Sequence, residues 1–143
     1  MGISVHLATA ADREDTVALW EAAGLTRPWN DPRSDFDLAL ATPTSTVLLA
    51  RDNERLSGSV MVGFDGHRGW VYYLAAAPDS RRQGVGRMLM RAAEEWLQAH
   101  GCPKIQLMVR GDNAQARGFY AALGYELQDV VTVGKRFADL NRG

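Results

Sequence analysis

The chain has 143 residues, of which 46% are hydrophobic and 23% are charged, with a formal net charge of −1 and one cysteine. These values are typical of one globular domain, residues 1–143, that is long enough to bury a core. They argue against a nucleic-acid-binding surface, a membrane-spanning segment, a signal peptide and an internal disulfide, and they favour a cytoplasmic address.

The first 41 residues predict one strand and two helices. Residues 3–8 alternate between apolar and polar side chains, as a strand does. Thr9 and Asp12 have the spacing of a capping box, which predicts a helix that ends near Gly24. A loop bounded by prolines follows, and a short helix is expected at residues 34–41.

The rest of the chain predicts strands separated by turns and two further helices. Turns rich in aspartate, asparagine and glycine divide the middle of the chain into strands. A long amphipathic helix is expected to end at His100, before Gly101 and Pro103. The expected strands are residues 46–51, 56–64, 70–76 and 104–109, with a final strand pair at residues 127–137.

A glycine-bearing turn between the strand at residues 70–76 and the long helix predicts an anion-binding site. The first amides of a helix lack intrahelical partners and, together with the helix dipole, favour a phosphate. Gly84 and Gly86 would let a phosphate approach the backbone. Arg87 and the absence of an acid in the first turn also favour an anion. The residues of this turn are Arg81, Arg82, Gln83, Gly84, Val85, Gly86 and Arg87.

A second block predicts a capped helix after the strand at residues 104–109. Asp112 or Asn113 is the expected N-cap, and Gly124 the residue just past the C-terminus. Ala116 and Tyr120 stand three and seven residues after the asparagine. An ordinary amphipathic helix explains this periodicity, but it does not explain why both blocks occur in this order with a strand between them.

The Arg-x-x-Gly-x-Gly turn and the Asn113 block together resemble the two motifs of the GNAT superfamily of N-acetyltransferases. The resemblance implies an α+β fold of three layers, with a mixed, mostly antiparallel sheet of six or seven strands and four flanking helices. It also implies that the central parallel strands splay apart and that acetyl-coenzyme A is the cosubstrate. A phosphate- or nucleotide-binding domain unrelated to acyl transfer is the alternative that the second block disfavours.

The resemblance assigns cofactor contacts to both blocks and to the strand before the turn. Pantetheine would pair with the backbone of Leu74, Ala75 and Ala76, and the pyrophosphate with the turn at residues 81–87. Asn113, Ala116 and Tyr120 would meet the cofactor near its sulfur. Tyr120 is the expected general acid to the departing thiolate, and backbone amides at residues 74–76 are the expected oxyanion donors.

The general base is left open by the sequence, because residues 70–77 contain no carboxylate. Ribosomal-protein alanine acetyltransferases carry a glutamate in the run that reads Leu107-Met108-Val109-Arg110 here, so Met108 departs from that pattern. The segments at residues 27–32 and 65–69 resemble the YpeA-type branch of the family instead. His67 and Asp65 are the alternative bases, although an Asp-Gly turn also arises for conformational reasons alone.

The expected acceptor is a primary amine of a peptide or a small molecule. In the resembled fold the loop with Trp29, Asn30 and Asp31 overhangs the acceptor groove, and His67 could face it; a loop that only redirects the chain is the alternative.

No metal site is predicted, because the histidines lack ligand-spaced partners. A monomer or homodimer is expected. A module that binds acetyl-coenzyme A without turnover is the second functional hypothesis.

Overall fold

The computed structural model describes residues 2–137, apart from the side chains of Arg81 and Arg82. The chain forms two compact units, residues 1–107 and residues 108–143. This division does not test the expected single domain, which stays a prediction. Within the described residues, no helix combines the length and the apolar character that crossing a membrane requires.

The first unit contains a five-stranded sheet in the order β1-β2-β3-β4-β5. Neighbouring strands are antiparallel from β1 to β4, and β4 and β5 are parallel. The expected mixed α+β fold is therefore confirmed. The strands are β1 (Ile3–Leu7), β2 (Ser45–Asp52), β3 (Arg55–Phe64), β4 (Gly69–Ala76) and β5 (Ile105–Leu107).

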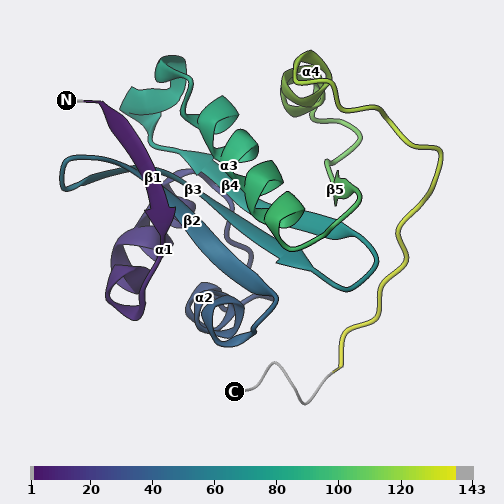
Figure 1. Ribbon diagram of the computed structural model, residues 1–143, viewed down its shortest axis with the longest axis horizontal. Helices are drawn as coiled ribbons and strands as arrows, with labels where there is room; N and C mark the ends of the chain where they lie inside the picture. The colour runs from purple at the N-terminus through teal and green to yellow at the C-terminus, as the bar shows by residue number, and fades with distance from the viewer. Residues whose placement is uncertain (1, 138–143) are drawn as a thin grey trace. The chain divides into compact units, whose positions relative to one another are not determined.

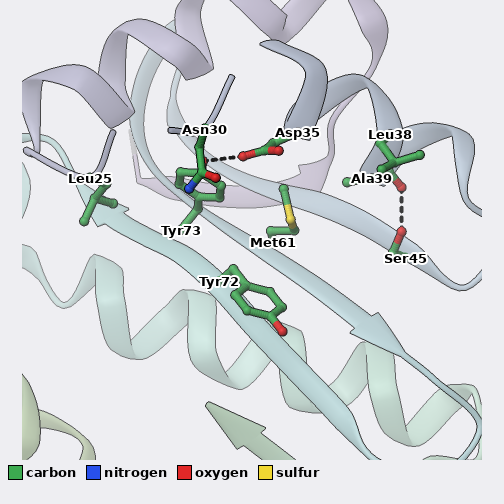
Figure 2. Close-up of a pocket in the computed structure, with 9 residues that line it drawn as sticks. All are labelled: Leu25, Asn30, Asp35, Leu38, Ala39, Ser45, Met61, Tyr72 and Tyr73. Atoms are coloured by element: carbon green, nitrogen blue, oxygen red, sulfur yellow. Dashed lines mark hydrogen bonds between the residues drawn. The ribbon is translucent and has the colours of Figure 1, made fainter. Parts of the chain in front are cut away.

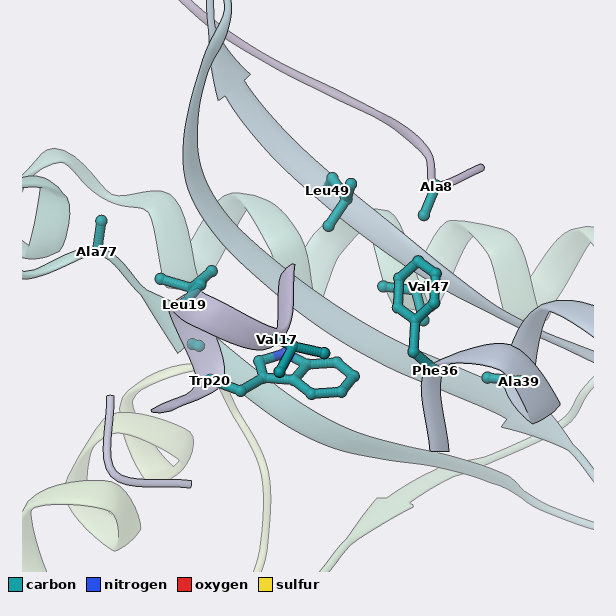
Figure 3. Packing of buried hydrophobic residues seen from close by; sticks show 10 residues of the cluster. Ala8, Val17, Leu19, Trp20, Phe36, Ala39, Val47, Leu49 and Ala77 are labelled. Atoms are coloured by element: carbon teal, nitrogen blue, oxygen red, sulfur yellow. The ribbon is translucent and has the colours of Figure 1, made fainter. Parts of the chain in front are cut away.

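Helices cover both faces of this sheet. In Figure 1, α3 runs across the sheet, and it connects the parallel strands β4 and β5. The side chains of α1 and α2 pack on the opposite face, where Figure 3 shows them with the strands lying between them and α3. The helices of the first unit are α1 (Arg13–Ala22), α2 (Pro32–Ala41) and α3 (Val85–Ala99), with short 3₁₀ turns η1 (Ala10–Asp12) and η2 (Pro78–Gln83).

The core under α1 and α2 is built around two aromatic rings. Trp20 and Phe36 are fully buried, with ring centroids 6.3 Å apart. Val47 and Leu49 of β2 point into the same cluster. Burying side chains of this size stabilises a fold by about 1.5–3 kcal/mol each. The cluster thus fixes α1 and α2 against the strands that lead into the candidate site.

On the other face, α3 approaches the sheet closely at two glycines. A Cβ on Gly58 of β3 would lie 2.5 Å from the Val85 side chain and 2.7 Å from the Ala75 carbonyl oxygen. A Cβ on Gly69 of β4 would lie 2.5 Å from the Leu97 side chain. Both contacts are shorter than side chains allow, so these glycines let both ends of α3 rest on the strands.

The predicted caps form at most of the expected helix starts. Thr9 and Asp12 make the reciprocal capping box, although it opens the 3₁₀ turn η1 rather than α1 directly. Asp31 caps α2, which begins at Pro32, two residues earlier than predicted, because proline fits the first helical position. In the second unit Asn113, not Asp112, caps α4 (Ala114–Ala122).

The predicted strand pair at residues 127–137 is wrong, and so is the expected count of six or seven strands. Residues 126–137 have no regular secondary structure, and Leu127 and Val133 are 84% and 90% exposed. A strand needs a neighbour to satisfy its backbone groups. Alternation of apolar and polar side chains, as in Val131-Thr132-Val133, is therefore an insufficient basis for predicting one.

Candidate functional site

The turn that leads into α3 is where the sequence predicts an anion cradle. Gly84 is left-handed, with φ of 76° and ψ of 20°, and stands immediately before the first residue of the helix. Val85 and Leu89 are fully buried and anchor the first turn to the sheet. The first turn contains no acidic residue, and Arg87 is exposed. The helix therefore presents its positive end to solvent without a neutralising carboxylate.

The space beside Gly84 is open. A Cβ built on Gly84 would meet no heavy atom within 4 Å, so the backbone here is open to a ligand. Gln83 is exposed beside it, whereas the side chains of Arg81 and Arg82 lie outside the described part of the chain. Unpaired first-turn amides suit the oxygens of a diphosphate.

The strand before the turn has a free edge. β4 pairs with β5 only from Gly69 to Val71, although β4 itself continues to Ala76. Among the described strands, none pairs with residues 72–76 on that side. The backbone of Leu74 and Ala76 lies in this stretch, so the edge is available to an extended ligand such as pantetheine.

A bulge interrupts β4 at the start of the free edge. Ser59 of β3 pairs with Ala75, but Met61 pairs with Tyr72, so two residues of β4 stand opposite one residue of β3. Tyr73 has a φ of 54°, a left-handed conformation that is unusual for an aromatic residue. Strained backbone of this kind occurs often at functional sites, and here it redirects the strand beside the free edge.

A set of buried contacts holds the bulge. The rings of Tyr73 and Trp20 stack with centroids 3.8 Å apart and an angle of 12°. The Trp20 indole N–H donates to Ser59 Oγ at 2.8 Å, and the Ser59 hydroxyl donates to the Tyr73 carbonyl oxygen at 3.0 Å. The strained residue is therefore fixed through both its ring and its backbone.

The hydroxyl of Tyr73 reaches a carboxylate on α2. It donates to Asp35 Oδ2 at 2.7 Å. Burial and then this hydrogen bond raise the pKa of Tyr73 well above its ordinary value. The phenol consequently remains protonated at neutral pH and continues to donate to Asp35.

Replacing Ser59 with alanine tests whether the serine links Trp20 to the bulge. We expect a loss of about 1–3 kcal/mol in the free energy of unfolding, because the buried indole N–H loses its acceptor. Chemical denaturation of the two proteins measures the difference. Ser57→Ala, at another buried serine of β3, is the matched control and should cost less. Equal losses in the two variants would contradict the proposed link.

A pocket of about 490 Å³ opens beside the bulge, between α2, the loop before it and strands β3 and β4. Figure 2 shows the Tyr73–Asp35 hydrogen bond in its lining, with Tyr72 and Met61 nearby. Because of the bulge, two consecutive tyrosines line the same pocket. The polar lining residues other than tyrosine are Asn30, Asp35 and Ser45, and the apolar ones are Leu25, Leu38, Ala39 and Met61.

The loop residues expected to meet an acceptor have three different environments. Trp29 is 54% exposed. Asn30 lines the pocket. The Asp31 carboxylate accepts hydrogen bonds from Ser34 and from the amide of Arg33, and the bonds from Ser34 contribute most to lowering its pKa. Asp31 therefore has a structural role as the cap of α2, whereas Asn30 is placed to contact a bound molecule.

The two candidate bases occupy the tight turn between β3 and β4. Asp65 Oδ1 accepts from the amides of His67 at 2.8 Å and Arg68 at 2.7 Å. These bonds, that from Arg68 most strongly, lower the pKa of Asp65 and so make it a weaker base. His67 is exposed. The Asp65 carboxylate is thus engaged by the amides of the turn and by the side chain of Trp70.

The second unit carries the remaining predicted residues on α4. Asn113 accepts a hydrogen bond from the amide of Ala116 at 3.0 Å, so its side-chain oxygen caps the helix. The ring of Tyr120 meets Phe119 and Tyr125 edge-on, with centroids 5.0 and 5.8 Å away. Burial raises the pKa of Tyr120, which keeps the phenol protonated at neutral pH.

Sequence reasoning missed Asp35 and Tyr73 as site residues. Asp35 meets Tyr73 across 38 positions of sequence, and no local pattern indicates this contact. A signal for Tyr73 does exist, because Tyr72 and Tyr73 place two large aromatics side by side in a strand with buried neighbours. Adjacent aromatics of this kind are compatible with a bulge that turns both to one face.

Within the described residues, no group of three or more histidine, cysteine, aspartate or glutamate side chains is arranged to hold a metal ion. The single cysteine, Cys102, is buried and its thiol donates to the carbonyl oxygen of Lys104 at 3.2 Å. The cysteine therefore packs as a small buried side chain.

Comparison with known proteins agrees with this geometry. Residues 4–125 match the family model described as the acetyltransferase (GNAT) family. The chain is 46% identical over 128 residues to acetyltransferase ECA0875 of Pectobacterium atrosepticum, an alignment that covers 90% of this chain and 91% of the relative.

Two solved structures illustrate the shared fold. The first is AAC(6')-Iy in complex with the bisubstrate analogue CoA-S-monomethyl-acetylneamine, with a TM-score of 0.83, 16% identity and coverage of 96% of this chain and 100% of that one. The second is the ribosomal-protein-alanine N-acetyltransferase of Brucella melitensis biovar Abortus 2308, with a TM-score of 0.77, 19% identity and coverage of 95% and 100%.

The family match extends over both units of the chain. It includes the bulged strand β4, the open N-terminus of α3 and the Asn113-capped helix. This chain therefore belongs to the GNAT family of acetyltransferases.

Proposed function

We propose that this chain is an N-acetyltransferase that moves the acetyl group of acetyl-coenzyme A directly to a primary amine in a ternary complex. The observation that carries the proposal is the continuity of β4, Gly84 and α3. A strand with a free edge leads into an open helix N-terminus that has no acid in its first turn. An extended pantetheine arm followed by a diphosphate suits this succession.

Acetyl-coenzyme A supplies an activated thioester, and the chain must stabilise charge as the acyl group moves. The amine nitrogen forms the new C–N bond, the C–S bond breaks, the amine loses a proton and the sulfur gains one. Backbone amides at residues 74–76 are the proposed donors to the oxyanion, an interaction worth about 3–4 kcal/mol. Tyr120 is the proposed donor of the proton to the sulfur.

The amine acceptor must lose a proton, but the sequence of β4 contains no carboxylate that could accept it. At pH 7, deprotonating a lysine side chain with a pKa of about 10.4 costs about 4–5 kcal/mol. An α-amine with a pKa of about 7.7–8.0 costs only about 1 kcal/mol. An α-amine or another weakly basic amine is therefore the easier acceptor. His67 is the remaining candidate base of the β3–β4 turn, because Asp65 is engaged by the turn itself.

The names of structural neighbours support an amine acceptor. The names of the AAC(6') and ribosomal-protein-alanine enzymes indicate substrates acetylated on nitrogen. We also propose that the chain belongs to the YpeA-type branch, which the segments at residues 27–32 and 65–69 resemble. We retain a monomer or homodimer as the expected oligomeric state.

Thiol release from acetyl-coenzyme A tests the proposal directly. The acceptor panel pairs peptides that have a free α-amine with the same peptides blocked at the N-terminus and carrying a lysine, and adds polyamines and aminoglycosides. We expect thiol release with at least one amine class, and preference for α-amines over lysines between pH 7 and 8.

The contrary outcomes separate the competing functions. Acetyl-coenzyme A binding without thiol release for any amine would favour a non-catalytic binding module. Absence of binding at millimolar concentration would reject the cofactor assignment itself. A preference for lysine, with a rate that rises only above about pH 9, would contradict the α-amine preference.

A further inference from the structure

The pocket beside the bulge is negatively charged. Among the described residues that line it, Asp35 is the one carboxylate, and none is lysine, arginine or histidine. The arginines of the adjoining helices contact other carboxylates, since Arg33 binds Glu14 at 2.8 Å and Arg13 binds Asp37 at 2.9 Å. The pocket thus carries a negative charge that no neighbouring cation in these pairs neutralises.

The Asp35 carboxylate is held in one orientation. Its Oδ2 accepts from the Tyr73 hydroxyl, and the Tyr73 ring is itself stacked on the fully buried Trp20. The side chain is partly buried. A preorganised, partly desolvated carboxylate oxygen of this kind binds a cation more strongly than one in free solution.

The rest of the lining is suited to an uncharged molecular body. Leu38, Met61 and the ring of Tyr72 offer apolar surface around the carboxylate, and Asn30 and Ser45 add neutral polar groups. A carboxylate on the ligand would be repelled by Asp35, and the lining contains no cation that could bind it. The lining therefore favours a cation with a neutral skeleton and disfavours a zwitterion.

We propose that this pocket binds the acceptor in its ammonium form, with the ammonium group on Asp35, and selects amines that lack a carboxylate next to the nitrogen. The substrate class is an organic amine or a peptide α-amine with a neutral or apolar neighbourhood, as opposed to a free amino acid. This inference rests on the proposed function and adds to it the group that recognises the acceptor.

Three probes that differ only beside the amine test the proposal on the full chain. Tyramine lacks the carboxylate, tyrosine carries it, and tyrosinamide replaces it with a neutral group of similar size. Calorimetry or ligand-observed NMR gives their dissociation constants without requiring turnover. We expect tyramine and tyrosinamide to bind the wild-type protein at least about tenfold more tightly than tyrosine. Tyrosine is a zwitterion, and repulsion between its carboxylate and Asp35 opposes the charge-assisted hydrogen bond from its ammonium group.

Substitutions on α2 assign the selectivity to Asp35. Asp35→Asn keeps an acceptor for the Tyr73 hydroxyl but removes the charge, and should weaken tyramine binding about ten- to a hundredfold and abolish the preference over tyrosine. Asp35→Glu keeps the charge and should retain the preference. Asp37→Asn, two residues along the same helix and paired with Arg13, is the matched control and should bind like the wild type. Thermal unfolding verifies that each variant is folded.

The outcomes are decisive in both directions. Unchanged tyramine binding in Asp35→Asn, an equal loss in Asp37→Asn, tighter binding of tyrosine, or no binding of any probe at millimolar concentration would each overturn the inference. Acetyl-coenzyme A affinity, measured in parallel, should not differ among the variants. If the amines bind as expected but no thiol is released, the proposed transfer fails while the acceptor site stands.

Discussion

Replacing Gly84 with valine is expected to weaken coenzyme A binding about a hundredfold or more. The residue has a φ of 76° and faces open space at the N-terminus of α3. A β-branched side chain there would fill the space that a diphosphate needs and would be strained in the left-handed region. Losing two charge-assisted hydrogen bonds to phosphate accounts for the size of the effect. Calorimetric titration with coenzyme A measures it.

Gly101→Val separates the loss of the cradle from general strain. Gly101 lies just beyond the other end of α3 and has a φ of 80°, and a Cβ placed on it would also meet no heavy atom within 4 Å. Both variants should lose about 1–2 kcal/mol of unfolding free energy from the same backbone strain. Only Gly84→Val should lose coenzyme A affinity. Equal affinities in the two variants would place the diphosphate elsewhere.

Replacing Tyr120 with phenylalanine is expected to lower turnover by about 10²–10⁴-fold while leaving acetyl-coenzyme A affinity unchanged. This is the usual contribution of a general acid. Because burial raises the pKa of Tyr120, the wild-type phenol is protonated throughout the neutral range. The wild-type rate should therefore lose its contribution from Tyr120 only above a pH of about 10. Steady-state kinetics and direct titration of the cofactor measure the two quantities separately.

Tyr125→Phe is the matched control for this variant. Its ring contacts Tyr120 edge-on within the same unit, so it shares the local packing. It should retain nearly full turnover. Turnover of Tyr120→Phe that equals the wild type would remove Tyr120 as the acid, and a rise in the dissociation constant of the cofactor would indicate a binding role instead.

Local rules predicted those parts of the site that depend on a few adjacent residues. The Asn113 cap and the Thr9–Asp12 capping box both follow from side-chain hydrogen bonds within one turn. The succession of strands and helices through α4 follows from hydrophobic periodicity in the same way.

Features that depend on distant partners escaped prediction. The bulge at Tyr73 is a property of the register between β3 and β4, and a single strand does not specify it. The position of Asp35 in the pocket results from α2 packing across the sheet, and its contact to Tyr73 is long-range. The strand prediction for residues 127–137 is wrong because it also depended on a distant partner. A strand-like pattern without a partner strand does not form a strand.

The proposed acetyl transfer requires the backbone amides at the start of α3 to receive the diphosphate of coenzyme A. Amide chemical-shift mapping during a titration with coenzyme A tests it residue by residue. We expect the largest shifts at the amides of Val85, Gly86 and Arg87, with smaller ones along residues 74–76 of β4. Unchanged resonances at residues 83–87 in millimolar coenzyme A, or shifts confined to other surfaces, would contradict it.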